Sequence, residues 1–249
     1  MLRIRHPDRY ELKYVLDRSQ YEQVVAGLAT HMEPDPHSEG GRYLVTSLYY
    51  DTADYKAYWD KIDGHRFRRK VRVRVYNVQM ISPDSLCFVE IKQRTNKTLQ
   101  KKRIILPYSS AIALCGSGAR ADGNTEAERA VIDEVLYLFN TLRLQPACIV
   151  SYDRLAFNGG AYDPGLRVTF DTNLKCRTHD LTLLSQGYAE NDFFVPPQWC
   201  VMEVKVNNRV PYWLTGVISR YRCTLRRISK YCTALEKSRA LLQQQRIHY

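Results

Sequence analysis

The sequence has no long apolar run. No stretch of its 249 residues approaches the ~20 consecutive apolar residues that a transmembrane helix requires. Residues 1–10 carry positive charges without an apolar segment behind them, so no secretory signal peptide is visible. Apolar residues make up 45% of the chain and charged residues 25%, which are ordinary values for a globular protein. We therefore expect a folded, soluble protein of the cytoplasm.

Several chemical motifs are also missing. The seven cysteines include no CxxC pair and have no histidines at zinc-ligand spacing, so we expect reduced and mostly packed thiols. The six histidines are scattered along the chain without the spacing of metal ligands. There is no Walker A sequence, so any bound ATP must be held in another way.

Positive charge is present in excess. Lysine and arginine total 37 against 26 acidic residues, which gives a formal net charge of +11. Such an excess favours an anionic partner: a nucleic acid, an acidic membrane surface or a phosphate-rich small molecule. Charge alone does not choose among the three.

Four segments combine helical spacing of apolar residues with a capping residue in front of them. Capping-box patterns precede the first and the third of these segments. The expected helices begin near Ser19, Thr52, Thr125 and Ser229, and the last one runs towards Gln245.

A different period, with charged and apolar residues in alternation, marks seven other segments. These expected strands are residues 11–15, 71–76, 88–92, 101–105, 152–156, 166–171 and 201–206. Few helices connect them, so the sheet should be largely antiparallel. No internal repeat or linker divides the chain, so we expect one α+β domain over residues 1–249.

The charged positions of these strands repeat arginine or lysine at i and i+2. A single strand of this kind usually has one face in solvent, but solvent-exposed faces mix both charge signs with neutral polar residues. Repetition instead favours a sheet whose charged face lines a tunnel and whose apolar face is covered by helices. Cations gathered in such a tunnel repel one another unless an anion, such as a chain of phosphates, fills it.

A family resemblance supports this interpretation. In sequence order, the short motifs that carry it are Glu11-x-Lys13, Arg72-x-Arg74, Glu90-x-Lys92, Tyr152-x-Arg154, Arg167, Glu203-x-Lys205 and Ser229-Lys230-Tyr231. The chain resembles the triphosphate tunnel metalloenzymes and, among them, the VTC domain, which is a polyphosphate polymerase module. The resemblance implies an antiparallel, eight-stranded β tunnel with a basic interior and flanking helices. It also implies transfer of the γ-phosphate of ATP to polyphosphate, assisted by Mn²⁺ or Mg²⁺.

The resemblance assigns roles to individual residues. Cations that would grip phosphates in catalysis are Lys13, Arg72, Arg74, Lys92, Arg154, Arg167, Lys205 and Lys230. Residues that would bind or orient the phosphate chain are Tyr152 and Ser229, together with Lys101 and Arg103 on the inward face of their strand. Glu203 would hold the metal, and Glu11 and Glu90 are the next candidates. Lys102 shares its face with apolar residues and is expected to point outward.

Two departures from the hydrolytic relatives bear on the reaction. These relatives typically have a Glu-x-Glu-x-Lys first strand, but Arg9 stands two positions before Glu11, and Val201 stands two positions before Glu203. Fewer carboxylates favour transfer to another phosphate over activation of water. The expected partners are thus ATP, polyphosphate, and orthophosphate or pyrophosphate. No SPX regulatory domain or membrane anchor is recognised, so we expect translocation not to be encoded here.

Two alternatives remain open. One is a metal-dependent tripolyphosphatase or nucleoside triphosphatase of the same superfamily. The other is a non-catalytic module that binds polyphosphate or nucleic acid. A nucleic-acid binder interleaves aromatic residues with exposed cations, whereas the aromatic residues here mostly fall in the expected helices. Nucleic acid is therefore not expected as a partner.

Overall fold

The computed structural model describes residues 9–37, 39–77, 80–96, 98–184, 192–207 and 209–238. Within the described ranges, two compact units are formed. Unit 1 consists of residues 9–44, 152–174 and 195–228, and unit 2 of residues 45–151, 175–194 and 229–238. Three long strands contribute to both units: β3 (Arg42–Asp51), β7 (Gln145–Gly159) and β8 (Asp163–Arg177). The expectation of a single domain over the whole chain remains a prediction.

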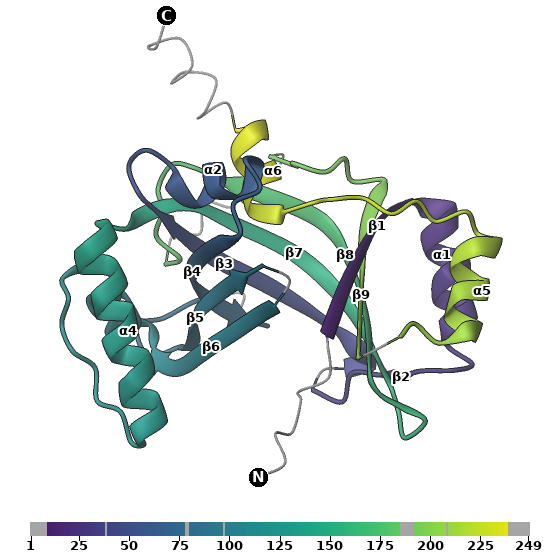
Figure 1. Cartoon of the computed structure of the whole chain (residues 1–249), viewed down its shortest axis with the longest axis horizontal. Coiled ribbons are helices and arrows are strands. Elements are labelled where there is room, and N and C mark those ends of the chain that lie inside the picture. Colours follow the sequence, from purple (N-terminus) through teal and green to yellow (C-terminus); the bar gives the residue numbers. More distant parts are fainter. Residues whose placement is uncertain are drawn as a thin grey trace, which may run out of the picture. The chain divides into compact units, whose positions relative to one another are not determined.

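The expected α+β class and antiparallel pairing are confirmed (Figure 1). Hydrogen-bonded neighbours follow the order β1-β9-β8-β7-β3-β4-β5-β6, so eight strands form one continuous path. A ninth, short strand, β2 (Glu33–Pro34), pairs with β7 beside this path. The eight strands on the path match the number that the family resemblance implies.

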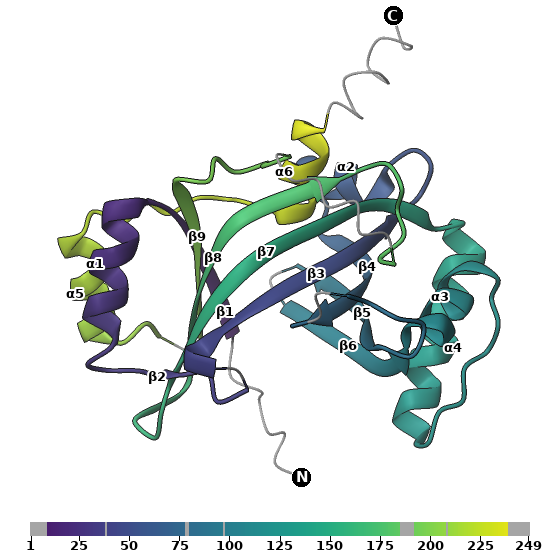
Figure 2. The ribbon, with the colours of Figure 1, turned by 180° about the vertical axis from the view of Figure 1, so that it is seen from behind.

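Unit 1 pairs β1 (Arg9–Asp17) with β9 (Trp199–Asn207), and β9 with β8. Helices α1 (Arg18–Leu28) and α5 (Tyr212–Arg220) lie side by side (Figure 2). They pack on the apolar face of these strands, where Leu16, Val24 and Phe170 are fully buried. The opposite face of the same strands is therefore left to the charged residues. A short 3-10 helix, η1 (Glu39–Gly41), precedes β3.

Unit 2 pairs β3 with β4 (Phe67–Tyr76), β4 with β5 (Leu86–Thr95), and β5 with β6 (Thr98–Pro107). Helices α3 (Tyr108–Gly116) and α4 (Glu126–Leu142) pack against β5 and β6. The core between these helices and the sheet includes Val73 and Val89 of the strands and Leu138 of α4. Helices α2 (Lys56–Ile62) and α6 (Lys230–Lys237) contact each other in the same unit.

Two of the four expected helix starts agree with the structure. Thr125 caps α4 in a reciprocal capping box with Glu128, and Ser229 caps α6, as expected. The start of α1 was misplaced, because the capping box is formed by Asp17 and Gln20 and not by Ser19. Asp17 ends β1 in an extended conformation, so its carboxylate is free to accept the Gln20 backbone N–H at 2.7 Å.

The second expected helix also begins later than Thr52. Helix α2 starts at Lys56, and Tyr55 in front of it adopts a left-handed conformation with φ 56°. The Thr52 hydroxyl nevertheless accepts the Lys56 backbone N–H at 2.8 Å, so it satisfies one N–H of the first turn. In the C-terminal helix, the part expected beyond residue 238 lies outside the described residues.

The seven strands expected from alternation are all present, but β2, β3, α3 and α5 were not anticipated. Helix α3 extends through Cys115 and ends at Gly116. All seven cysteines are free thiols, and six of them are buried. Across the described part of the chain, no helix has the length and apolar character needed to cross a bilayer.

Candidate functional site

In unit 1 the charged face of the sheet is built by strand register. Glu11 of β1 lies opposite Lys205 of β9, which in turn lies opposite Arg167 of β8. One step along, Lys13 lies opposite Glu203. Directly opposite residues of neighbouring strands point to the same face. Alternation along three strands thus gathers both charge signs on one surface, which we call the unit 1 charged face.

Lys13 is placed between two carboxylates. Its Nζ lies 3.1 Å from Glu11 Oε1 and 3.2 Å from Glu203 Oε1. Glu203 also has Arg154 at 4.0 Å and Lys205 at 3.9 Å from its Oε2. Its side chain is only 8% exposed. Glu203 is therefore a buried carboxylate surrounded by three cations.

Arg154 and Asp171 form a bidentate ion pair in the interior of unit 1. Arg154 Nε donates to Asp171 Oδ1 at 2.6 Å, and its terminal nitrogen donates to Oδ2 at 2.8 Å. Burial alone would lower the pKa of Arg154, but the negative charge of Asp171 outweighs it and raises that pKa well above the usual value. Arg154 is thus held as a rigid, permanent cation, with its planar group fixed for further donation.

Arg167 is held by a different set of residues from those that hold Arg154. It donates to the Asp35 carboxylate at 2.5 Å, to the Tyr43 hydroxyl at 3.0 Å and to the Asn158 side chain at 2.8 Å. Burial raises the pKa of Asp35, but its hydrogen bond with Arg167 and the charge of that group lower it overall. The side chain of Arg167 remains 26% exposed, so it is more accessible than the side chain of Arg154, which is 8% exposed.

In unit 2 the register places cations in rows across β4, β5 and β6. Lys70 lies opposite Lys92, which lies opposite Lys101. The face shared by these residues carries eight cations and the carboxylate of Glu90, and we call it the unit 2 cationic face. Its cations are Arg68, Lys70, Arg72, Arg74, Lys92, Arg94, Lys101 and Arg103.

Glu90 neutralises part of this face. Its carboxylate contacts Arg72, with Nε at 2.7 Å, and forms an ion pair with Lys101. Burial raises the pKa of Glu90, but the positive charges of Arg72, Arg74 and Lys101 outweigh it and lower the pKa to about 2. Glu90 is 1% exposed, so it is a buried counter-ion that positions Arg72 and Lys101.

Arg103 and Lys102 of β6 lie on opposite faces of the sheet. Arg103 lies opposite Glu90 and contacts the Phe88 ring at 5.1 Å from its centroid. Lys102 lies on the opposite face, where its Nζ is 2.5 Å from Glu134 of α4. Lys101 and Arg103 therefore share the unit 2 cationic face, and Lys102 does not.

Tyrosine hydroxyls contact the arginines in both units. In unit 2, Arg72 donates to Tyr49 at 2.9 Å and Arg74 to Tyr76 at 3.5 Å. Burial raises the pKa of Tyr49, but the charges of Arg72 and Arg74 lower it overall. Arg74 also donates to the Ser47 hydroxyl at 2.9 Å. Neutral acceptors thus orient the guanidinium groups without cancelling their charge.

The same arrangement recurs in unit 1, where Tyr43 accepts from Arg167 and Tyr152 accepts from Arg154 at 3.4 Å. These tyrosines lie on strands, so the expectation that aromatic residues mostly fall in helices does not hold for them. Tyr152, which the resemblance assigned to phosphate binding, is buried and contacts Arg154. The Tyr152 hydroxyl therefore helps to orient the guanidinium group of Arg154.

The N-terminus of α6 lies against β4. Lys70 Nζ is 3.2 Å from the Ser229 hydroxyl, which also accepts the Cys232 backbone N–H at 3.4 Å. Lys230 is 7% exposed, and its charge helps to lower the pKa of Tyr49. Ser229 and Lys230 therefore adjoin the unit 2 cationic face.

Asp51 fixes the position of this helix. The carboxylate is completely buried and accepts the backbone N–H groups of Ala57 at 2.8 Å and Tyr58 at 3.1 Å in α2. It also accepts the Tyr231 hydroxyl of α6 at 2.5 Å. One side chain at the end of β3 thus ties two helices together and holds Lys230 in place.

The oxygen donors of unit 1 fit a hard divalent cation. Glu11 and Glu203 are bridged by Lys13, and Thr169 lies opposite Glu203 with a buried hydroxyl that has no hydrogen-bond partner among the described residues. No group of three or more His, Cys, Asp or Glu residues suited to a metal occurs in the described ranges. Mg²⁺ is commonly bound by one or two carboxylates together with substrate phosphates, so a small set of protein ligands is compatible with it.

The candidate site residues are divided between the two units. Unit 1 contains Glu11, Lys13, Tyr152, Arg154, Arg167, Glu203 and Lys205, and unit 2 contains Arg72, Arg74, Glu90, Lys92, Lys101, Arg103, Ser229 and Lys230. Their roles remain predictions. Sequence reasoning missed the residues that orient them: Asp35, Tyr43, Ser47, Tyr49, Asp51, Lys70 and Asp171. Asp171 continues the charged positions of β8 after Arg167, and Lys70 precedes Arg72 at a charged position of β4. The alternation of these strands could therefore have identified both residues.

The fold is an α+β arrangement in which charged and apolar residues alternate along antiparallel strands. The family model of the VTC domain matches residues 8–239. The chain therefore belongs to the VTC domain family, and the resemblance identified in the sequence is confirmed.

Solved structures are similar in fold over nearly the whole chain. A candidate adenylyl cyclase from Hippeastrum, described as having a dominant triphosphatase activity, has a TM-score of 0.52 and 13% identity, covering 91% of this chain and 94% of that chain. Candidate adenylate cyclases from Bacillus halodurans (TM-score 0.49, 12% identity, 89% and 95% covered) and Vibrio parahaemolyticus (0.47, 10%, 93% and 99%) are also similar. At 13% identity, the Hippeastrum protein supports the fold alone. No curated protein sequence matches this chain.

Proposed function

We propose that this protein is an ATP-dependent polyphosphate polymerase, which transfers the γ-phosphate of ATP to a growing phosphate chain with the assistance of a divalent metal. The observation that supports it best is the unit 2 cationic face, where eight cations share one surface with the single carboxylate of Glu90. Directly opposed like charges destabilise a sheet. A polyanion of closely spaced phosphates compensates that cost over many contacts at once.

The residues present suit recognition of phosphate rather than of bases. Tyrosine and serine hydroxyls help to orient the guanidinium groups and, unlike the paired carboxylates, add no negative charge. Arginine offers forked donors for bidentate contacts with phosphate oxygens, and lysine offers a compact charge. The tyrosines accept from arginines, and Tyr49 and Tyr152 are buried, so these two rings are not exposed platforms for stacking.

The transfer itself needs little from a protein base. A terminal oxygen of polyphosphate is ionised at neutral pH and attacks the γ-phosphorus of ATP. A new P–O bond forms, the bond from the γ-phosphorus to the β,γ-bridging oxygen breaks, and ADP leaves with that electron pair. Phosphoryl transfer depends chiefly on positioning and charge neutralisation, which cations of the unit 2 cationic face such as Arg72 and Lys92 would supply.

Glu203 and Glu11 would hold the metal, with the Thr169 hydroxyl beside them. Bound there, Mn²⁺ or Mg²⁺ would neutralise phosphate oxygens and help to orient them. Lys13, which now bridges the two carboxylates, would then be released to contact phosphate. Arg154 and Lys205 would keep the local charge positive and disfavour a second metal.

A triphosphatase is the second candidate, and the Hippeastrum protein of similar fold, described as having a dominant triphosphatase activity, favours it. Hydrolysis needs a positioned and activated water, usually with further carboxylates or a second metal. The position two residues before Glu203 is Val201, which is buried and apolar. This residue supports transfer to phosphate over transfer to water.

The proposal can be tested by following ATP by ³¹P NMR in the presence of Mn²⁺ or Mg²⁺. Growth of the resonance of internal phosphates, with ADP as the other product, is the expected result. ATP conversion to ADP and orthophosphate without internal phosphates would favour the triphosphatase. Failure to consume ATP or tripolyphosphate would leave a phosphate-binding module.

A further inference from the structure

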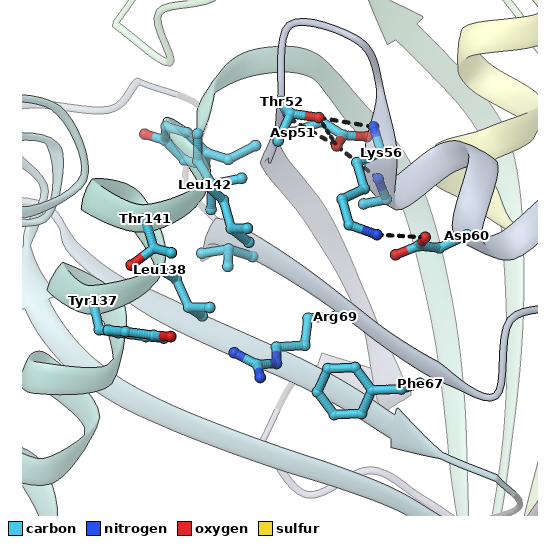
Figure 3. A pocket seen from close by; sticks show the side chains of 14 residues that line it. Asp51, Thr52, Lys56, Asp60, Phe67, Arg69, Tyr137, Leu138, Thr141 and Leu142 are labelled. Atoms are coloured by element: carbon cyan, nitrogen blue, oxygen red, sulfur yellow. Dashed lines mark hydrogen bonds and ion pairs between the residues drawn. The ribbon is translucent and has the colours of Figure 1, made fainter.

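Unit 2 has a pocket on the side of β4 that faces away from the cationic residues. It lies between β4, the end of β3, α2 and α4, and has a cavity volume of about 170 Å³ (Figure 3). Phe67, Arg69 and Val71 of β4 line it, whereas Lys70 and Arg72 point to the opposite face. The proposed phosphate chemistry does not use this pocket.

Most of its wall is apolar. Leu138 and Leu142 of α4 and Leu144 beyond it form one side, and Val71 forms another. A cavity of ~150 Å³ lined by such residues accommodates a benzene ring. The pocket is therefore large enough for one six-membered ring or a branched aliphatic group of similar size.

Arg69 is the exception in this wall. Its guanidinium stacks on the Phe67 ring, 4.6 Å from the centroid, and its Nε is buried without a hydrogen-bond partner among the described residues. Figure 3 shows the guanidinium between Phe67 and the side chains of Tyr137 and Leu138. A buried donor without a partner is rare in folded proteins and costs free energy. Arg69 therefore lines the pocket with a donor that has no acceptor among the described residues.

The two carboxylates of the pocket are already engaged. Asp51 accepts backbone N–H groups of α2 and the Tyr231 hydroxyl. Asp60 is paired with Lys56 at 2.7 Å and with His65 at 3.0 Å. Two carboxylates in the wall would repel a polyanion such as triphosphate. They leave Arg69 as the group to which a single negative charge can bind.

From this combination we infer a binding site for a small monocarboxylate with an aromatic or branched apolar body. Its carboxylate would accept from Arg69, and its apolar body would lie against Leu138 and Leu142. This site is separate from the proposed phosphate site and does not depend on the polymerase assignment. Guanidinium–carboxylate pairing and ring burial are complementary requirements, so ligands with only one of them should bind more weakly.

The test uses benzoate as the probe and the purified full chain, with binding measured by calorimetry. We expect saturable binding of benzoate, and at least about tenfold weaker binding of acetate, which lacks the ring, and of benzyl alcohol, which lacks the carboxylate. Equal binding of benzyl alcohol, or no saturable benzoate binding, would overturn the inference without any variant being needed.

Variants then locate the site. Arg69→Gln should raise the dissociation constant of benzoate about tenfold or more. Arg68→Gln is the matched control, because it removes the same charge from the adjacent residue on the opposite face of β4, and it should bind benzoate as the wild type does. Leu142→Trp should fill the cavity and prevent binding. Benzoate affinity that is unchanged in a folded Arg69→Gln protein would overturn the inference.

Discussion

Arg154 and Asp171 form a bidentate ion pair, 2.6 and 2.8 Å long, in the interior of unit 1. Asp171 has no exposed surface, and Arg154 is 8% exposed. Arg154 is the more buried of the two candidate phosphate-binding arginines in unit 1, and Asp171 is its counter-ion. Removing Arg154 should therefore affect the stability of the fold as well as ligand binding.

This pairing changes what is expected of Arg154→Ala. On a face that gathers cations, loss of one of them by itself relieves repulsion. In the structure, however, this substitution leaves the buried carboxylate of Asp171 without its guanidinium partner, which costs about 3–5 kcal/mol of the free energy of unfolding. This loss of stability is measured by urea denaturation. Adding Asp171→Asn to Arg154→Ala should recover part of the loss, and an Arg154→Ala protein as stable as the wild type would contradict the account.

A second prediction concerns stability at low pH. The pKa of Glu90 is lowered to about 2 in the folded protein. A lowered pKa means that the carboxylate stabilises the folded state above its unfolded pKa, and that this contribution is lost as the pH falls from about 4.5 towards 2. Its size is about 3 kcal/mol. The unfolding free energies of wild type and Glu90→Gln should therefore converge over this interval, and a constant difference would argue against the pairing.

The third prediction compares two lysines on opposite faces of the unit 2 sheet. Lys92→Met should weaken tripolyphosphate binding about tenfold or more, as expected for loss of a charge-assisted contact. Lys102→Met is the control, since Lys102 pairs with Glu134 on the helix-covered face, and it should bind normally. Titrations at several salt concentrations should give a smaller salt dependence for Lys92→Met. Equal effects of the two substitutions would show that only net charge matters.

Glu203 is the subject of the fourth prediction. Glu203→Gln should abolish metal-dependent phosphate transfer while tripolyphosphate still binds without metal, because the surrounding cations remain. Glu11→Gln should reduce the metal dependence less, since Glu11 is the more exposed of the two carboxylates. The metal requirement is measured by titrating Mn²⁺ or Mg²⁺ against the rate. A Glu203→Gln protein with wild-type turnover would exclude Glu203 as the ligand and leave it as the counter-ion of Lys13.

Alternation was sufficient to find seven strands, because each exposes one charged face and packs the other. It could not reveal β3, of which the last seven residues are all buried. A strand buried on both faces has no alternation to detect. The missing β3 carries Tyr43, Ser47, Tyr49 and Asp51, so the groups that orient the arginines and α6 were missed with it.

The candidate cations could be named from the sequence, but their partners could not. Asp35 and Arg167 are 132 residues apart, and Asp51 and Tyr231 are 180 apart. Such pairs are created by tertiary packing, and no local spacing encodes them. Local signals had a similar limit at α1, where Ser19 and Asp17 are both good capping residues and the end of β1 decides between them.

The central claim is that the protein extends phosphate chains with ATP. The most direct measurement incubates the purified chain with ATP, Mn²⁺ and a short polyphosphate primer, and resolves the products by gel electrophoresis, with Glu203→Gln as the inactive control. The account predicts ADP and a ladder of chains longer than the primer. Orthophosphate as the sole phosphate product, with the primer unextended or shortened, would contradict it and establish the triphosphatase instead.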